Sequence, residues 1–213
     1  MAISTAVDAG AVARVVGIQT IFKNTRTNGV AILPQRIALI GQGSTTAAYS
    51  EDRRQITSAT EAGNLYGHGS PIHLAAKQLF PTNGDGVGTI PVTVYPLVNE
   101  ADAVASIGDI TPAGTATQSG QYRVEVNGIR SEPFVVLANA TVATIVASIT
   151  TAINAVLEMP VVAADGATKV DLTAKWKGTS ANAIEVSVMG ALNSGLTFAI
   201  TQPTGGLLNP SVS

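Results

Sequence analysis

The residues best suited to chemistry are two glycines followed by a run of hydroxyl side chains, in the segment IALIGQGSTT of residues 37–46. A strand that ends in a glycine-rich turn with hydroxyls holds phosphate in many α/β proteins. A dinucleotide fingerprint needs a third glycine where Thr46 stands, and a P-loop needs a lysine that the segment lacks. We therefore interpret Gly41-Gln42-Gly43 as a tight turn after a buried strand, and not as a nucleotide site.

The two histidines, His68 and His73, are five positions apart. That spacing does not place both on one helix face, and no carboxylate nearby completes a metal site. We expect one loop residue and one helix-surface residue. Glu51, Asp52 and Asp85 are expected in loops as solvated carboxylates. The sequence thus predicts no catalytic, cofactor-binding or metal-binding residue.

One basic and aromatic segment, Lys175-Trp-Lys-Gly-Thr179, has the residue types that contact nucleic acid. The chain has a net charge of −2 and no basic block, so we expect no direct nucleic-acid partner. A turn at the end of a strand is the favoured interpretation of this segment.

The composition favours a protein that packs against neighbours. Hydrophobic residues make up 46% and charged residues 12% of the chain, so much of the surface must be Thr, Ser, Asn, Gln and Gly. There is no cysteine, which excludes disulfides and Cys-type zinc sites. No apolar run is long enough to span a membrane, and the first residues do not resemble a signal peptide. We expect a soluble protein that is used without secretion.

The elements that must position these residues begin with residues 1–33, which show no sustained period and are expected to form an extended N-terminal arm. A disordered terminus is the alternative. Residues 34–99 predict a partial α/β domain with strands at 37–40 and 92–97. Its two helices are predicted from a capping box at Ser58-Ala-Thr-Glu61 and from Ser70-Pro71, the second helix running through Phe80.

Residues 100–205 predict an inserted, β-rich domain that resembles a β-sandwich and contains one helix. Asn127-Gly128 is a strong hairpin signal between an alternating strand, 121–126, and its return. Thr141 is expected to cap the helix, whose apolar face comprises Val142, Ile145, Val146, Ile149, Ile153, Val156 and Leu157. Strand-like runs follow at 161–163, 169–174, 184–189 and 196–200, and residues 206–213 are expected to be a return linker. The predicted fold class is mixed α/β and α+β.

Several of these stretches together resemble contractile phage tail sheath proteins of the Mu-like group. The N-terminal part of that family is similar to LPQRIALIGQGS (33–44), SATEAGNLYGHGSPIHLAAKQLF (58–80) and IPVTVYPL (90–97). The inserted module is similar to YRVEVNGIR (122–130), ATIVASITTAINA (143–155) and VDLTAKWKGTSANAIEVSV (170–188). Leu172-Thr173-Ala174, Lys177-Gly178-Thr179 and Asn182 stand where the family has the same residues.

The resemblance implies a structural protein without enzyme activity or cofactors. Such subunits polymerise helically around the tail tube and contract, which drives the tube through the host envelope for genome ejection. The implied partners are other sheath subunits, the tube protein, the baseplate and the tail terminator, with no membrane insertion. The implied location is the phage tail of the virion, assembled in the host cytoplasm. The resemblance also implies an arm that adds a strand to another subunit's sheet, formed by Ile18, Thr20, Ile21, Phe22, Lys23 and Asn24.

Three questions stay open at this stage. Family members are longer, so this chain is a fragment, half of a split sheath or a shortened form. A β-rich adhesin or tail-fibre module that binds carbohydrate or a receptor is the alternative function, supported by the Thr- and Gly-rich strands. A third interpretation, an α/β enzyme that acts on a small molecule, is supported by the glycine turn alone.

Overall fold

The computed structural model describes residues 35–84, 86–191 and 194–210. The predicted arm of residues 1–33, with Ile18, Thr20, Ile21, Phe22, Lys23 and Asn24, lies outside these ranges. So do Asp85 and residues 211–213.

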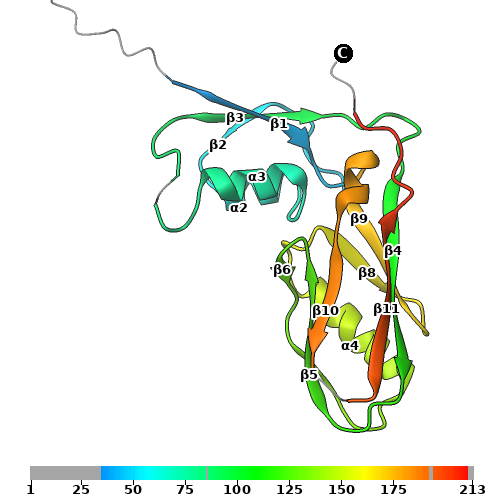
Figure 1. Cartoon of the computed structure of the whole chain (residues 1–213). Coiled ribbons are helices and arrows are strands. Elements are labelled where there is room, and N and C mark those ends of the chain that lie inside the picture. Colours follow the sequence, from blue (N-terminus) through cyan, green and yellow to red (C-terminus); the bar gives the residue numbers. More distant parts are fainter. Residues whose placement is uncertain (1–34, 85, 192–193, 211–213) are drawn as a thin grey trace, which may run out of the picture. The chain divides into compact units, whose positions relative to one another are not determined.

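The first group of elements forms a three-stranded sheet with two helices, which we call the α/β unit (Figure 1). The strands lie in the order β1-β3-β2, with β3 parallel to β1 and antiparallel to β2. The two strands predicted at 37–40 and 92–97 therefore form and pair in parallel. The elements of the unit are β1 (Ile37–Gln42), β2 (Arg54–Ile56), α2 (Ala59–Tyr66), α3 (Pro71–Leu79) and β3 (Val92–Leu97).

Both helices of the α/β unit begin at the caps that the sequence predicts. The Oγ atom of Ser58 accepts a hydrogen bond from the backbone N–H of Glu61 over 3.1 Å, which opens α2. The Oγ atom of Ser70 accepts one from the backbone N–H of His73 over 3.2 Å, and Pro71 occupies the first helical position of α3. Helix α3 ends at Leu79, one residue before the predicted end.

The helices cover one face of this sheet, and within the described ranges the other face stays open. The buried cluster consists of Ile56, Ala62, Tyr66, Ile72, Ala76, Val92 and Val94. On the opposite face Ile40 and Tyr95 are neighbours in the β1–β3 register, and they are 59% and 39% exposed. The expectation of a fully buried strand at 37–40 was therefore wrong, because only alternate side chains of β1 face the helices.

The second group, which we call the β-rich module, consists of two antiparallel sheets and one helix. The sheet orders are β11-β4-β9-β8 and β10-β5-β6, with β7 also paired to β5. The β elements are β4 (Ala105–Gly114), β5 (Gly120–Val126), β6 (Ile129–Arg130), β7 (Phe134–Val136), β8 (Val161–Asp165), β9 (Val170–Lys177), β10 (Val186–Gly190) and β11 (Leu196–Thr204). Helix α4 (Val142–Asn154) and the 3₁₀ helix η2 (Thr179–Ala183) complete the module.

Helix α4 fills the core of this module with an apolar face. Ile145, Val146, Ile149, Ala152 and Ile153 are its buried residues, and they join one large cluster with residues of both sheets. Thr141 caps the helix as predicted. The helix ends at Asn154, however, so Leu157 does not belong to its apolar face and is 64% exposed.

The hairpin at Asn127-Gly128 is confirmed, with β5 and β6 paired directly on either side of it. Both turn residues have positive φ angles, 48° and 79°, as a tight two-residue turn requires. Strand β4, the longest of the described strands, was not predicted from the sequence; it pairs with both β11 and β9. Gly108 and Pro112 lie inside β4 and interrupt the pattern by which strands are recognised.

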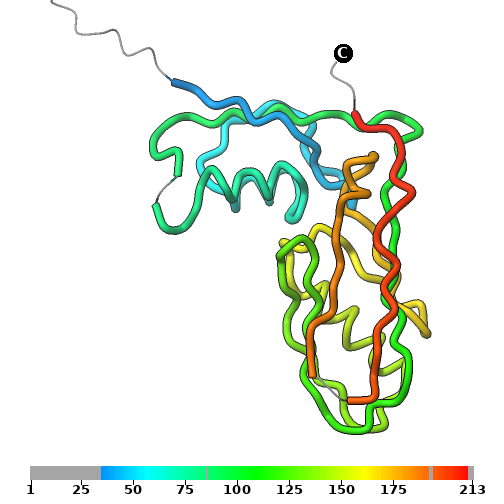
Figure 2. Tube along the Cα trace, in the orientation of Figure 1, coloured from blue at the N-terminus to red at the C-terminus, as the bar shows by residue number. Residues whose placement is uncertain are grey.

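The chain enters and leaves the β-rich module at one place (Figure 2). Val104, just before β4, and Leu207, just after β11, form an antiparallel bridge. The N–H of each donates to the carbonyl oxygen of the other over 3.1 Å. The α/β unit and the module belong to one compact unit of the chain, Gln35–Ser213. Within the described residues no helix is long and apolar enough to cross a membrane.

Candidate functional site: the junction and the open strand edge

The glycine segment serves the packing of the α/β unit. Strand β1 runs through Gln42, so the interpretation of Gly41-Gln42-Gly43 as a tight turn was wrong for its first two residues. A Cβ atom on Gly41 would lie 3.2 Å from Cγ1 of Ile72, and one on Gly43 would lie 3.1 Å from the carbonyl oxygen of Tyr66. The glycines therefore let helices α2 and α3 approach the strand closely.

The backbone N–H groups after this strand already have partners inside the protein. The N–H of Ser44 donates to the carbonyl oxygen of Tyr66 over 2.7 Å, and that of Thr45 to the carbonyl oxygen of Lys175 over 2.7 Å. The N–H of Thr46 donates to Oγ of Ser44 over 3.3 Å. A phosphate site needs such groups to point at the ligand. The geometry thus agrees with the interpretation that this segment does not bind a nucleotide.

The expected surface position of His73 was wrong, because this side chain is only 2% exposed. Its Nδ1 atom accepts a hydrogen bond from the backbone N–H of Gly69 over 3.0 Å. The ring of His68 meets it edge-on, with 4.9 Å between the ring centroids, and both rings lie against Gly63. Burial, with a smaller contribution from His68, lowers the pKa of His73 to about 4. His73 is therefore neutral at pH 7.

The two histidines belong to a contact surface between the α/β unit and the β-rich module, which we call the junction. At its centre the Nζ atom of Lys175 donates to the carbonyl oxygen of His68 over 3.0 Å and to that of Leu157 over 2.8 Å. Burial of this ammonium group lowers the pKa of Lys175. One lysine of β9 thus joins the α2–α3 loop to the segment that follows α4.

Further bonds extend the junction on both sides of Lys175. The Nε2 atom of Gln42 donates to the carbonyl oxygen of Lys177 over 2.8 Å, so the end of β1 is bonded to the end of β9. Lys77 of α3 forms an ion pair with Glu158. A Cβ atom on Gly69 would overlap the carbonyl oxygen of Met159, which shows how closely the two backbones approach. The α/β unit therefore holds the module by several independent contacts.

The segment Lys175-Trp-Lys-Gly-Thr179 was expected as a turn, but Lys175 to Lys177 are the last residues of β9. Trp176 is 6% exposed, and its Nε1 donates to Oγ of Ser180 over 3.2 Å. A buried indole offers no face on which a base can stack. Among the described residues there is also no group of three His, Cys, Asp or Glu side chains that could hold a metal ion.

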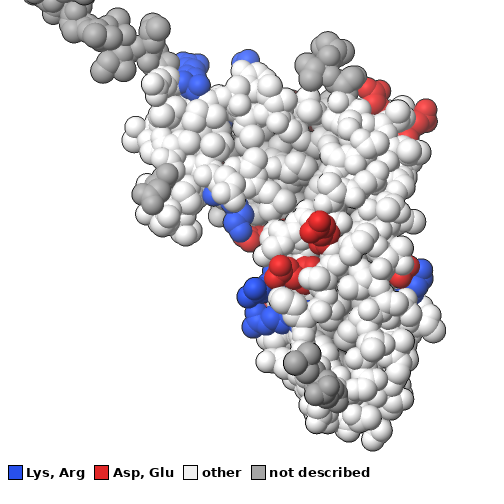
Figure 3. Space-filling view, in the orientation of Figure 1, with Lys and Arg blue, Asp and Glu red and all other residues white. Residues whose placement is uncertain are grey.

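The second candidate surface is the outer edge of β1. This six-residue strand pairs with β3 alone, and no other described strand lies on its far side. An edge of this kind presents backbone N–H and C=O groups to which an extended segment of another chain can bond. Figure 3 shows a face of the protein on which charged side chains are few and most of the surface is uncharged. A surface of that kind repels neighbours weakly.

Comparison with known proteins finds a sheath protein. The Mu-like prophage FluMu tail sheath protein of Haemophilus influenzae is 25% identical to this chain over 198 residues. The match covers 90% of this chain and 40% of that protein, so the chain spans less than half of its relative's length. No family model matches the sequence. The match confirms the resemblance to tail sheath proteins of the Mu-like group that the sequence motifs indicated.

Proposed function

We propose that this chain is a structural subunit of a contractile phage tail sheath. The observation that carries the proposal is the match to a tail sheath protein along 90% of the chain. A sheath component has a structural role and is not an enzyme, and the occupied N–H groups after β1 agree with that role. In this proposal the protein is a component of the virion tail.

The architecture that we propose has a partial α/β core domain at residues 34–99 and an inserted β-rich domain at 100–205. An extended arm at 1–33 and a return linker at 206–213 complete it. Two observations support the insertion. The buried residues fall into two separate clusters, one for each group of elements. The bridge between Val104 and Leu207 brings the two ends of the inserted part together.

The proposed assembly uses the open edge of β1. An arm from a neighbouring subunit, built from the residues around Ile18 to Asn24, adds a strand to a sheet of the next subunit. Repetition of this contact gives a helical polymer around the tail tube, with the baseplate and the tail terminator at its ends. Contraction of the polymer then drives the tube through the host envelope and delivers the genome. Assembly takes place in the host cytoplasm.

Within a subunit, the junction has the task of transmitting movement. A sheath that contracts must move its domains together, because a freely hinged domain would absorb the displacement. Lys175, Gln42 and the ion pair of Lys77 with Glu158 tie the module to the α/β unit at separate points. We infer that the α/β unit and the module move as one body.

Electron microscopy of negatively stained protein tests the proposed function. The protein should be observed alone and in a mixture with a second chain. The second chain should supply the part of a sheath protein to which the present chain does not align. Tubes or helical polymers are the expected result. A monodisperse protein that binds glycans would contradict the sheath and support the alternative of a carbohydrate- or receptor-binding adhesin.

A further inference from the structure

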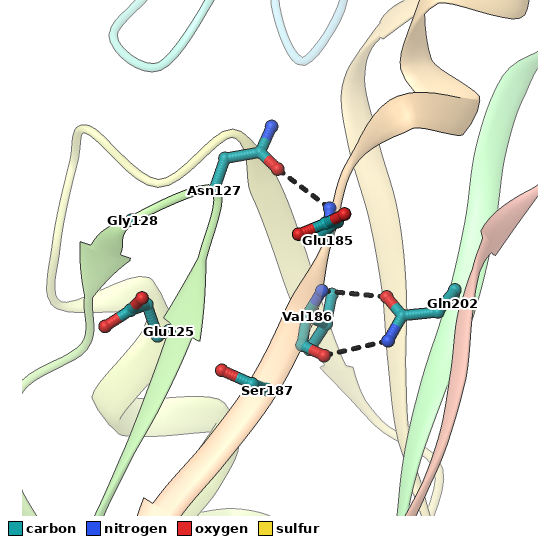
Figure 4. A pocket seen from close by; sticks show the side chains of 7 residues that line it. All are labelled: Glu125, Asn127, Gly128, Glu185, Val186, Ser187 and Gln202. Carbon is teal, nitrogen blue, oxygen red and sulfur yellow. Dashed lines mark hydrogen bonds between the residues drawn. The ribbon is translucent and has the colours of Figure 1, made fainter.

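Two side-chain amides in the β-rich module form paired hydrogen bonds to the backbone of a strand residue. The Oε1 atom of Gln202 accepts from the N–H of Val186 over 2.8 Å, and its Nε2 donates to the carbonyl oxygen of Val186 over 2.9 Å (Figure 4). Asn154 does the same to Ala163, with distances of 3.0 Å from the Ala163 N–H and 2.8 Å to its carbonyl oxygen. Each amide takes the two groups that a further strand would use.

Both amides act on strands at the edges of their sheets. Val186 is the first residue of β10, which ends the order β10-β5-β6, and Ala163 is the central residue of β8, which ends the order β11-β4-β9-β8. Gln202 reaches β10 from β11, a strand of the other sheet, and Asn154 reaches β8 from the last position of α4. Unpaired groups at a sheet edge are a template for strand addition by another chain.

We propose that Gln202 and Asn154 are edge caps that prevent a second copy of this chain from adding a strand to β10 or β8. The chain needs such caps because only 12% of its residues are charged, and charged side chains are a common protection of sheet edges. Strand β8 begins with four apolar residues, VVAA, and would otherwise suit intermolecular pairing.

The other edges of the module carry the usual protections. Pro203, which has no N–H to donate, lies in β11. On the far side of β5, strand β6 has two residues and β7 has three, and Pro133 precedes β7. The edge caps therefore complete the closure of the module. Under the proposed function this directs strand addition to the α/β unit, but the inference rests on the amide bonds alone.

Alanine substitutions in the full chain test the caps. Asn182→Ala is the matched control, because Asn182 forms the same paired bonds to Gly206, with distances of 2.7 Å and 3.1 Å, and Gly206 lies outside the strands. In sedimentation velocity we expect the double variant Gln202→Ala/Asn154→Ala to self-associate at a concentration about tenfold lower than the control or the unmodified chain. Association equal to that of Asn182→Ala would overturn the proposal.

Hydrogen exchange of the unmodified chain is an independent measurement if the alanine variants do not fold. With the caps in place, the exchange of peptides that cover β8 and β10 should be the same at low and high protein concentration. Protection of either strand that rises with concentration would show that another copy pairs there, and would overturn the proposal. Protection of β8 or β10 is distinguishable from assembly through the arm, because assembly through the arm would protect β1 instead.

Discussion

Gly69 donates its backbone N–H to the Nδ1 atom of His73 over 3.0 Å, inside the junction. The bond requires that Nδ1 carries no proton, so the ring is the neutral tautomer with its proton on Nε2. The charged groups around the ring are Lys77 of the same helix and, from the β-rich module, Glu158 and Lys175; His68 is its other titratable neighbour. Protonation of His73 would put an N–H opposite the N–H of Gly69.

We expect this histidine to make the protein less stable in acid. Its pKa in the folded state is about 4, below the usual 6.5 of an unfolded chain, so the unfolded state binds the proton more readily. The contribution is fully present above pH 6.5 and is lost as the pH falls to about 4, at up to about 1.4 kcal/mol per pH unit and about 3 kcal/mol in total. Urea unfolding at several pH values should show the slope. His73→Gln should remove this part of the slope, whereas His68→Gln should leave most of it, because burial contributes more than His68 to the lowered pKa of His73. An unchanged slope in His73→Gln would assign the slope to other groups.

Lys175→Met should weaken the junction. The substitution keeps an unbranched apolar stem but removes the ammonium group, so the carbonyl oxygens of His68 and Leu157 lose their donor. We expect a loss of roughly 1–3 kcal/mol in the free energy of unfolding, measured with urea. Lys169→Met is the control, since Lys169 pairs with Asp109 and Asp171 near the surface, where the loss should be below about 1 kcal/mol. Equal losses would mean that the junction bonds add nothing beyond a surface ion pair.

A comparison of two glycines with similar φ angles can separate the cost of backbone strain from the cost of steric overlap. Gly69 and Gly84 have φ angles of 80° and 85°, so alanine costs roughly 1–2 kcal/mol of backbone strain at either position. A Cβ atom at Gly84 meets nothing within 4 Å, whereas one at Gly69 overlaps the carbonyl oxygen of Met159. Gly69→Ala should therefore lower the melting temperature clearly more than Gly84→Ala. Similar shifts would show that the junction can open at no cost.

The core of the β-rich module should not tolerate a charge on the buried face of α4. Ile149 is fully buried, while Ala147, two positions earlier in the helix, is exposed. Ile149→Asp should unfold the module, because a carboxylate there has no partner, with a cost of more than about 4 kcal/mol. Ala147→Asp should change stability by about 0.5 kcal/mol or less, because the position is exposed. NMR spectra of the two variants would decide, and a dispersed spectrum for Ile149→Asp would refute the packing of α4.

Deletion of residues 1–28 should impair assembly without unfolding the protein. The apolar stretch Val15 to Phe22 is expected to pair with a neighbour, so circular dichroism and melting temperature should change little while polymer formation is lost. Deletion of residues 1–14 is the control, because it keeps that stretch and should preserve assembly. Unfolding of the longer deletion would show that the arm packs on its own subunit, and normal assembly would show that it is dispensable.

Local signals in the sequence predicted the local structure well. The caps at Ser58 and Ser70 and the Asn127-Gly128 turn are set by residues within four positions, and all three form. Strand β4 could not be predicted from its own sequence, which contains a glycine and a proline. Its stability comes from pairing with β9 and β11. Pairing with neighbouring strands therefore determined the secondary structure where the local strand propensity was poor.

The junction could not be predicted for a similar reason. Lys175 and its acceptor on His68 are 107 positions apart, and Gln42 and Lys177 are 135 apart. Nothing in the spacing of these residues links them, and a lysine in a strand is normally assigned to the solvent. His73 was placed on a helix surface because the sequence shows which helix carries it, but not what packs against that helix. The resemblance to sheath proteins could be detected because it depends on the order of short motifs along the chain.

The bridge between Val104 and Leu207 has an evolutionary consequence. Because the backbone departs and returns at adjacent positions, a gene can lose, gain or replace the codons for the whole module in one recombination event. A short turn would be enough to reconnect the α/β unit afterwards. A replacement module must still supply hydrogen-bond partners for Gln42 and for the α2–α3 loop, which the present module does through strand β9. Exchange of the module between related chains should therefore preserve the end of β9 more strictly than the rest of the module.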